Sequence, residues 1–172
     1  IITGSIAASR CKEIITLLNT NKVKISCILT KEAKKYLKIS DIKKLLKNRI
    51  FTDEDEKKNK MLHINLSRDN DIIVMCPATA NSIAKFANGY GDNLASNTLL
   101  ASNKKILFVP AMNSFMWHNK INQKNVRLLK DSGHEFIGPT VGNLKCGEFG
   151  LGRIDDSKNI INRILSRLEN IN

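Results

Sequence analysis

Several features common in other protein classes are missing from this sequence. No apolar run approaches the roughly 20 residues that a membrane-spanning helix needs, and no charged-then-apolar signal segment is present. The four cysteines are far apart, with no CxxC pair and no histidine at metal-ligand spacing. We therefore expect no membrane partner and no metal, with the reducing cytoplasm as the location. Cys11, Cys27 and Cys76 fall in predicted helical or apolar segments and are interpreted as small buried hydrophobic residues.

Acidic and aromatic residues are also few. The chain has 16 Asp and Glu against 28 Lys and Arg, a formal net charge of +12, and only 5% aromatic residues. A basic nucleic-acid-binding module is the alternative that composition alone allows, and it would be colourless and bind in a salt-sensitive way. However, the lysines are scattered and have almost no aromatic residues among them, so we expect no nucleic-acid partner. A diffuse positive field would instead attract an anionic, phosphate-bearing substrate.

Predicted strands and helices alternate along the chain. This order predicts an α/β fold, a three-layer doubly wound parallel sheet of the flavodoxin or Rossmann-like type, as one domain over residues 1–172. Because Ile1 is not methionine and falls in a predicted strand, we expect a few residues upstream. The expected strands cover residues 1–3, 23–29, 72–76, 106–109 and 135–137. After a turn at residues 4–5, the expected helices cover residues 6–18, 31–46 (with a break near 40–41), 62–68, 82–88, 93–101, 123–132 and 157–168. Residues 52–60 are expected to form a charged loop, and the glycine-rich residues 138–153 an irregular, mobile flap.

The segments that follow the predicted strands are rich in small and hydroxyl-bearing residues. They read TGSIA after the first strand, TK after the second, PATANS after residue 76 and PAMN after residue 109. In such sheets ligands bind outside the carboxyl ends of the strands, where free amides at helix starts suit a phosphate. The first turn lacks the GxGxxG spacing, no acidic residue follows the second strand, and no P-loop is present. The pattern predicts a nucleotide-like cofactor other than a nicotinamide dinucleotide.

Five segments carry a resemblance that spans nearly the whole chain. They are ITGSIAA (2–8), LHINLSR (62–68), PATANSIAKFANGYGDNL (77–94), PAMNSFMW (110–117) and GNLKCGEFGLGRI (142–154). In this order and spacing they resemble the homo-oligomeric flavin-containing cysteine decarboxylases, and within that family the members that act on phosphopantothenoylcysteine. The resemblance implies flavin mononucleotide (FMN) as cofactor, a phosphorylated small-molecule substrate of coenzyme A synthesis, and a trimer or a multiple of trimers.

The resemblance also implies roles for individual residues. His63 and Cys146 match catalytic positions of the family, and Asn113 and Met116 match positions that bind the substrate. The residues implied for the flavin are Gly4, Ser5, Ile6, Thr30, Thr79, Asn81, Ser82 and Ala111. The sequence departs from the family at Ser82, where threonine is commoner, and at Ser9-Arg10, which replace an aromatic-lysine pair.

The chemistry implied by the resemblance answers a physical difficulty. Loss of carbon dioxide from an amino-acid carboxylate leaves an unstabilised carbanion, so an electron sink is needed. Oxidation of the substrate's cysteinyl thiol to a thioaldehyde supplies one, because the carbanion then delocalises onto sulfur as an ene-thiolate. His63 would assist the oxidation, Asn113 would orient the carboxylate, and Cys146 would donate the proton that completes a redox-neutral cycle.

Other readings stay open at this point. A peptidyl-cysteine oxidative decarboxylase would stop at the ene-thiol, which the presence of Cys146 disfavours. A flavin prenyltransferase of related fold would leave the PAMN and LKCG segments unexplained. A non-catalytic, flavin-binding regulatory subunit of a phosphatase is the alternative from a different class, although the long acidic extensions usual there are not seen.

Overall fold

The computed structural model describes residues 1–47 and 49–171. Its strands are β1 (Cys27–Ile28), β2 (Ile50–Phe51), β3 (Ile73–Ala78), β4 (Ile106–Pro110), β5 (Glu135–Phe136), β6 (Thr140–Asn143) and β7 (Phe149–Arg153). Its α-helices are α1 (Cys11–Thr20), α2 (Ile39–Leu46), α3 (Asp53–Lys58), α4 (Leu62–Arg68), α5 (Ala80–Ala87), α6 (Leu94–Leu100), α7 (Ser114–His118), α8 (Lys120–Asp131) and α9 (Ser157–Glu169). Two 3-10 helices, η1 (Ile6–Arg10) and η2 (Glu32–Lys35), follow the first two turns. Among the described residues, none of these helices is long and apolar enough to cross a membrane.

The central strands pair in parallel, and the extended N-terminal segment lies in the middle of them. β1 pairs with β2, and β3 pairs with β4, which pairs with β5. Ile2 forms a parallel bridge with Leu29, and the Ile1 carbonyl accepts a hydrogen bond from the Cys76 amide at 2.9 Å. The spatial order is therefore β2, β1, the N-terminal segment, β3, β4, β5. In chain order this is the 3-2-1-4-5-6 arrangement of a doubly wound sheet, which confirms the predicted fold class.

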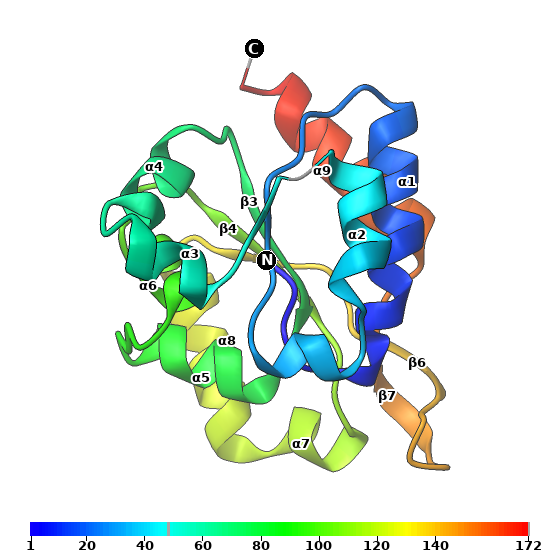
Figure 1. Ribbon diagram of the computed structural model, residues 1–172. Helices are drawn as coiled ribbons and strands as arrows, with labels where there is room; N and C mark the ends of the chain where they lie inside the picture. Colours follow the sequence, from blue (N-terminus) through cyan, green and yellow to red (C-terminus); the bar gives the residue numbers. More distant parts are fainter. Residues whose placement is uncertain (48, 172) are drawn as a thin grey trace.

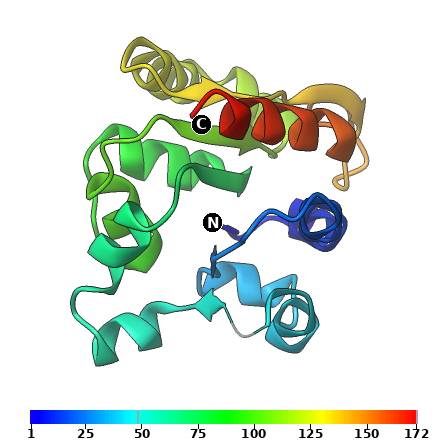
Figure 2. The same ribbon diagram turned by 90° about the horizontal axis from the view of Figure 1, so that it is seen from above.

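Helices cover both faces of the sheet (Figures 1 and 2). α1, α2 and α9 lie on one face, while α4, α5, α6 and α8 lie on the other. Adjacent residues of one strand face opposite layers: Met75 packs in the cluster with α5 and α8, and Cys76 packs toward α1. Burial on both faces explains why β3 and β4 read as continuous apolar runs.

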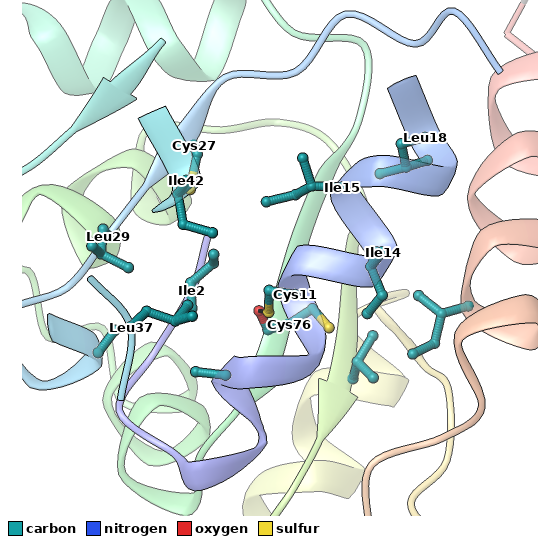
Figure 3. Packing of buried hydrophobic residues seen from close by; sticks show 14 of the residues in the cluster. Ile2, Cys11, Ile14, Ile15, Leu18, Cys27, Leu29, Leu37, Ile42 and Cys76 are labelled. Atoms are coloured by element: carbon teal, nitrogen blue, oxygen red, sulfur yellow. Dashed lines mark hydrogen bonds between the residues drawn. The ribbon is translucent and has the colours of Figure 1, made fainter. Parts of the chain in front are cut away.

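The layer beneath α1 also accounts for three of the cysteines (Figure 3). Cys11, Cys27 and Cys76 are buried among isoleucine and leucine side chains. The Cys11 thiol donates a hydrogen bond to the Cys76 carbonyl at 3.1 Å. Burial raises the pKa of Cys27 to about 11. The burial of all three side chains confirms their interpretation as small core residues.

The charged segment 52–60 is not a loop as predicted, because most of it forms α3. The Thr52 amide and hydroxyl both donate to Asp55 Oδ2, at 2.8 and 2.9 Å, and so fix the first turn. Acidic residues then fill the first turn and lysines the last, which complements the helix dipole. The run of charged residues predicted a loop, whereas the structure has a helix with a capping box at its start.

The prediction that residues 138–153 lack regular structure is also wrong. β6 and β7 form an antiparallel hairpin. Its glycines permit close packing rather than irregularity: a Cβ at Gly150 would lie 2.8 Å from Ser114 Oγ, and one at Gly152 would lie 2.3 Å from the Met112 carbonyl oxygen. The Met112 amide donates to the Gly152 carbonyl at 3.0 Å and holds the hairpin against the loop after β4.

Smaller differences concern element boundaries. α7 was not predicted, and α8 begins at Lys120 rather than residue 123, because Asn113 and Asn119 cap the two helices with their side chains. The break in the helical segment 31–46 falls at residues 36–38, not at 40–41. β3 and β4 also continue through Pro77 and Pro110 instead of ending before them.

Candidate active site

A large cleft opens where the N-terminal segment and β3 end side by side. Helical connections leave these two neighbours in opposite directions, so their carboxyl ends form the topological switch point of the sheet. The cleft has a volume of about 1230 Å³. With the exception of His63, every residue predicted for the site lines it: Gly4, Ser5, Ile6, Thr30, Thr79, Asn81, Ser82, Ala111, Asn113, Met116 and Cys146.

The first wall of the cleft is the turn into η1. The Ser5 hydroxyl accepts from the Ala7 amide at 3.3 Å, and the Ser5 amide donates to the Thr3 carbonyl at 2.9 Å. Gly4 packs so tightly that a Cβ there would lie 2.4 Å from Glu32 Cβ. Only glycine lets the turn lie this close to the start of η2, where Thr30 Oγ1 accepts from the Ala33 amide at 3.3 Å.

The second wall is the start of α5. Thr79 Oγ1 accepts from the Ser82 amide at 3.2 Å and lies 2.9 Å from Ser82 Oγ. This cap satisfies the Ser82 amide, one of the first backbone amides of α5. The amides before it have no carbonyl partner within the helix, as is general at the start of an α-helix. Ala111, at the end of β4, is small and buried and donates its amide to the Ala78 carbonyl at 3.2 Å. Helix-start amides next to small side chains fit a phosphate and a flat ring.

The third wall is α7 together with the β6–β7 hairpin. Asn113 Oδ1 accepts from the amides of Phe115 and Met116 at 2.8 and 3.3 Å, which leaves Nδ2 to point away from the helix. Asn113 Nδ2 lies 3.6 Å from Cys146 Sγ and donates to Glu148 Oε2. The Cys146 thiol donates to the same Glu148 oxygen at 3.5 Å. Asn113 and Cys146, which are 33 positions apart, are thus brought into contact.

Glu148 was missed by sequence reasoning. It stands two residues after Cys146 in the same turn, which was the only available signal. Nothing in the sequence indicated that its carboxylate contacts both predicted residues.

His63 lies apart from this cluster. It sits on α4 with its side chain 25% exposed, and its Nδ1 is 2.7 Å from Glu56 Oε1 of α3. Asn97 Nδ2 also contacts that carboxylate, at 3.5 Å. His63 does not line the cleft of its own chain.

The cleft is lined by more basic than acidic side chains. The basic residues are Arg10, Lys31, Lys35, Lys85, Lys145 and Arg153; the acidic ones are Glu32, Asp53 and Asp92. Two of the acids are paired: the hydrogen bond and charge of Lys85 lower the pKa of Asp92, and those of Lys35 lower the pKa of Glu32. The net positive lining favours an anionic ligand. Within residues 1–47 and 49–171, no group of three His, Cys, Asp or Glu side chains is arranged to hold a metal ion.

Residues 1–169 match the protein-family model described as Flavoprotein. The chain belongs to the flavoprotein family. This flavoprotein is 31% identical over 171 residues to a probable phosphopantothenoylcysteine decarboxylase of Streptococcus mutans, covering 97% of this chain and 96% of the relative. It is also 31% identical over 162 residues to the coenzyme A biosynthesis bifunctional protein CoaBC of Bacillus subtilis, covering 93% of this chain but only 40% of that protein.

A solved structure supports the same relationship. A PPC decarboxylase mutant complexed with pantothenoylaminoethenethiol superimposes on this flavoprotein with a TM-score of 0.87 at 29% identity, covering 98% of this chain and 95% of that one. The resemblance read from the five sequence segments is therefore confirmed at the level of the family.

Proposed function

We propose that this flavoprotein is an FMN-dependent decarboxylase that converts 4′-phosphopantothenoylcysteine into 4′-phosphopantetheine in coenzyme A synthesis. The observation that carries the proposal is the contact between Asn113 Nδ2 and Cys146 Sγ, 3.6 Å apart, in the cleft that the residues predicted for the flavin also line. The relatives named for this activity support it. We propose further that residues 1–172 form one catalytic domain that works in the cytoplasm.

The residues of the first two walls fit a flavin mononucleotide. Gly4, Ser5 and Ile6, with Asn81 and Ser82, would hold the phosphate and ribityl chain by amides and hydroxyls at helix starts. Thr30, Thr79 and Ala111 would line the rest of the cofactor site. When bound, the flavin would supply an electron acceptor for the substrate thiol and return the electrons at the end of the cycle.

Asn113 is suited to hold the carboxylate that will leave. Its Oδ1 is committed to two backbone amides of α7, so a ligand can be bound only by Nδ2, through the N–H that is not donated to Glu148. A neutral amide orients the carboxylate without the strong ground-state stabilisation that a salt bridge would give, and so does not oppose loss of carbon dioxide. Met116, which is half-exposed in the same cleft, would pack against the substrate chain.

Cys146 is suited to protonate the ene-thiolate left by decarboxylation. Its thiol is exposed, unlike those of Cys11, Cys27 and Cys76, and lies in a turn at the mouth of the cleft. A proton from this thiol would let the cycle end at a saturated thiol. A peptidyl-cysteine oxidative decarboxylase, the second candidate, needs no such donor, so Cys146 disfavours it. A non-catalytic regulatory subunit would not need the Asn113–Cys146 contact, so the contact disfavours that alternative as well.

His63 requires a separate explanation, because it lies outside the cleft of its own chain. We propose that subunits assemble as a trimer, or a multiple of trimers, so that His63 of one chain reaches the cleft of another. There its ring would assist proton removal during thiol oxidation. The measurement is the mass of the purified protein in solution: a multiple of three chains is expected, and a stable, active monomer would contradict this assembly.

The function is tested by adding 4′-phosphopantothenoylcysteine to the FMN-loaded protein and determining the mass of the product by mass spectrometry. A saturated product lighter by one carbon dioxide is expected. A peptide with a C-terminal cysteine serves as the competing substrate. Turnover of the peptide alone, or of neither compound, would overturn the proposal.

A further inference from the structure

Glu148 is joined to both groups that the proposed function places at the reacting centre. Its Oε2 atom accepts hydrogen bonds from Asn113 Nδ2 and from the Cys146 thiol, and the amide also contacts the sulfur. The three side chains form a closed triangle across the gap between α7 and the hairpin. Each of the three side chains contacts the other two. Glu148 is the carboxylate among them.

The backbone around Glu148 fixes this arrangement from both sides. The Leu144 amide donates to the Glu148 carbonyl at 2.8 Å, and the Gly147 amide donates to the Leu144 carbonyl at 3.0 Å, which closes the turn that carries Cys146. Gly147 has φ +89°, a conformation that favours glycine. On the other side, Asn113 is fixed as the N-cap of α7. The Glu148 carboxylate therefore holds the turn against the start of α7, in the third wall of the cleft.

We propose that Glu148 is a positioning residue that holds the Cys146 thiol over Asn113 and returns its proton after turnover. The inference rests on the proposed function, since it concerns the last proton transfer of that cycle. A hydrogen bond to a carboxylate is stronger than one to a neutral acceptor, so Glu148 fixes the position of the Cys146 thiol more firmly than an amide side chain would. Lys145 and Arg153 are the cationic residues of the hairpin and its turn that line the same cleft.

The proton balance is as follows. The Cys146 S–H bond breaks and its proton forms a C–H bond on the carbon that lost carbon dioxide. The neighbouring, sulfur-bearing carbon would receive a hydride, an electron pair together with its hydrogen, from the reduced flavin of the proposed function. Cys146 is left as a thiolate. Glu148, after taking a proton from water, passes it to that sulfur and becomes a carboxylate again. The half-buried position of Glu148 on an exposed turn gives water access to it.

The first test measures the thiol directly in the FMN-loaded protein. Cys146 is the exposed cysteine, while Cys11, Cys27 and Cys76 are buried, so alkylation by iodoacetamide at neutral pH reports on it. Glu148→Gln should raise the alkylation rate roughly three- to tenfold, because a neutral amide holds the Cys146 sulfur in the turn less firmly than the carboxylate does. Glu169→Gln, the same charge change on the exposed end of α9 far from the hairpin (Figure 1), should leave the rate within about twofold of wild type. An equal rate in Glu148→Gln and wild type would overturn the proposal.

The second test measures how the product divides. Glu148→Gln should still release carbon dioxide but yield a larger share of unsaturated ene-thiol, and Glu148→Asp should restore most of the saturated product. A role in folding alone would lower both products equally, and that result would also overturn the proposal. If the wild-type protein releases no carbon dioxide, the proposed function fails, and the alkylation rates alone then decide whether Glu148 controls Cys146.

Discussion

The cleft has two regions that are built in opposite ways. In the proposed flavin cradle, formed by the turn at Gly4 and the start of α5, side-chain oxygens are already used to cap the local helices, and tight packing fixes the backbone. In the β6–β7 hairpin, the polar side chains are directed at one another and at α7, and Cys146 is exposed. The cradle therefore offers mainly backbone amides and shape, whereas the hairpin offers reactive groups. This difference predicts that changes in the first region affect cofactor binding and changes in the second affect the outcome of the reaction.

Gly4→Ala should have the largest effect. The added methyl group would lie 2.4 Å from Glu32 Cβ, so the turn must shift. We expect flavin binding to weaken by roughly 100-fold, on the order of 3 kcal/mol, as measured by quenching of FMN fluorescence. Gly89→Ala is the control, because its methyl group meets nothing within 4 Å and only its φ of +71° adds strain. An equal loss of flavin affinity in Gly4→Ala and Gly89→Ala would show that the close packing at Gly4 is not what flavin binding requires.

Gly152→Ala should have an intermediate effect of a different kind. Its methyl group would lie 2.3 Å from the Met112 carbonyl oxygen and would push the hairpin away from α7. We expect the rate of saturated product formation to fall by roughly 10- to 100-fold while flavin affinity changes by less than about threefold. The measurements are product analysis and FMN titration, with Val141→Ala on the exposed face of β6 as control. Loss of flavin together with activity would show that the two regions are not separable.

Ser82→Ala should have the smallest effect. Its hydroxyl contacts Thr79 Oγ1, but the cap of α5 depends on the Ser82 amide, which the substitution keeps. We expect flavin affinity to fall by less than about tenfold and the free energy of unfolding to change by roughly 0.5 kcal/mol or less, from FMN titration and urea unfolding. A loss as large as that of Gly4→Ala would mean that the side chain, not the backbone, holds the phosphate.

The sequence could predict the fold and the edge of the sheet at which the cleft lies, because both depend on local rules. Alternating strands and helices determine a parallel sheet, and ligands bind at its carboxyl ends, where Gly4, Thr79 and Ala111 stand. The hairpin could not be predicted, because glycines read as loop signals until the packing of Gly150 and Gly152 against the loop after β4 is known.

Two features of the site also lay beyond sequence reasoning. The role of Glu148 depends on a contact between two segments more than 30 positions apart, which no local pattern encodes. The position of His63 outside the cleft depends on how α4 packs against α3. Its proposed place in the chemistry depends in addition on the proposed assembly of chains. The resemblance indicated that His63 matches a catalytic position of the family, but it gave no distance between His63 and the cleft.

The most direct test of the central claim is the absorption spectrum of the bound flavin during a single turnover of 4′-phosphopantothenoylcysteine by wild type and Cys146→Ser. The wild-type protein should end with oxidised flavin and a saturated thiol, since the cycle is redox-neutral. Cys146→Ser should still release carbon dioxide but end with bleached, reduced flavin and the unsaturated ene-thiol. Saturated product and oxidised flavin at an unchanged rate in Cys146→Ser would contradict the account.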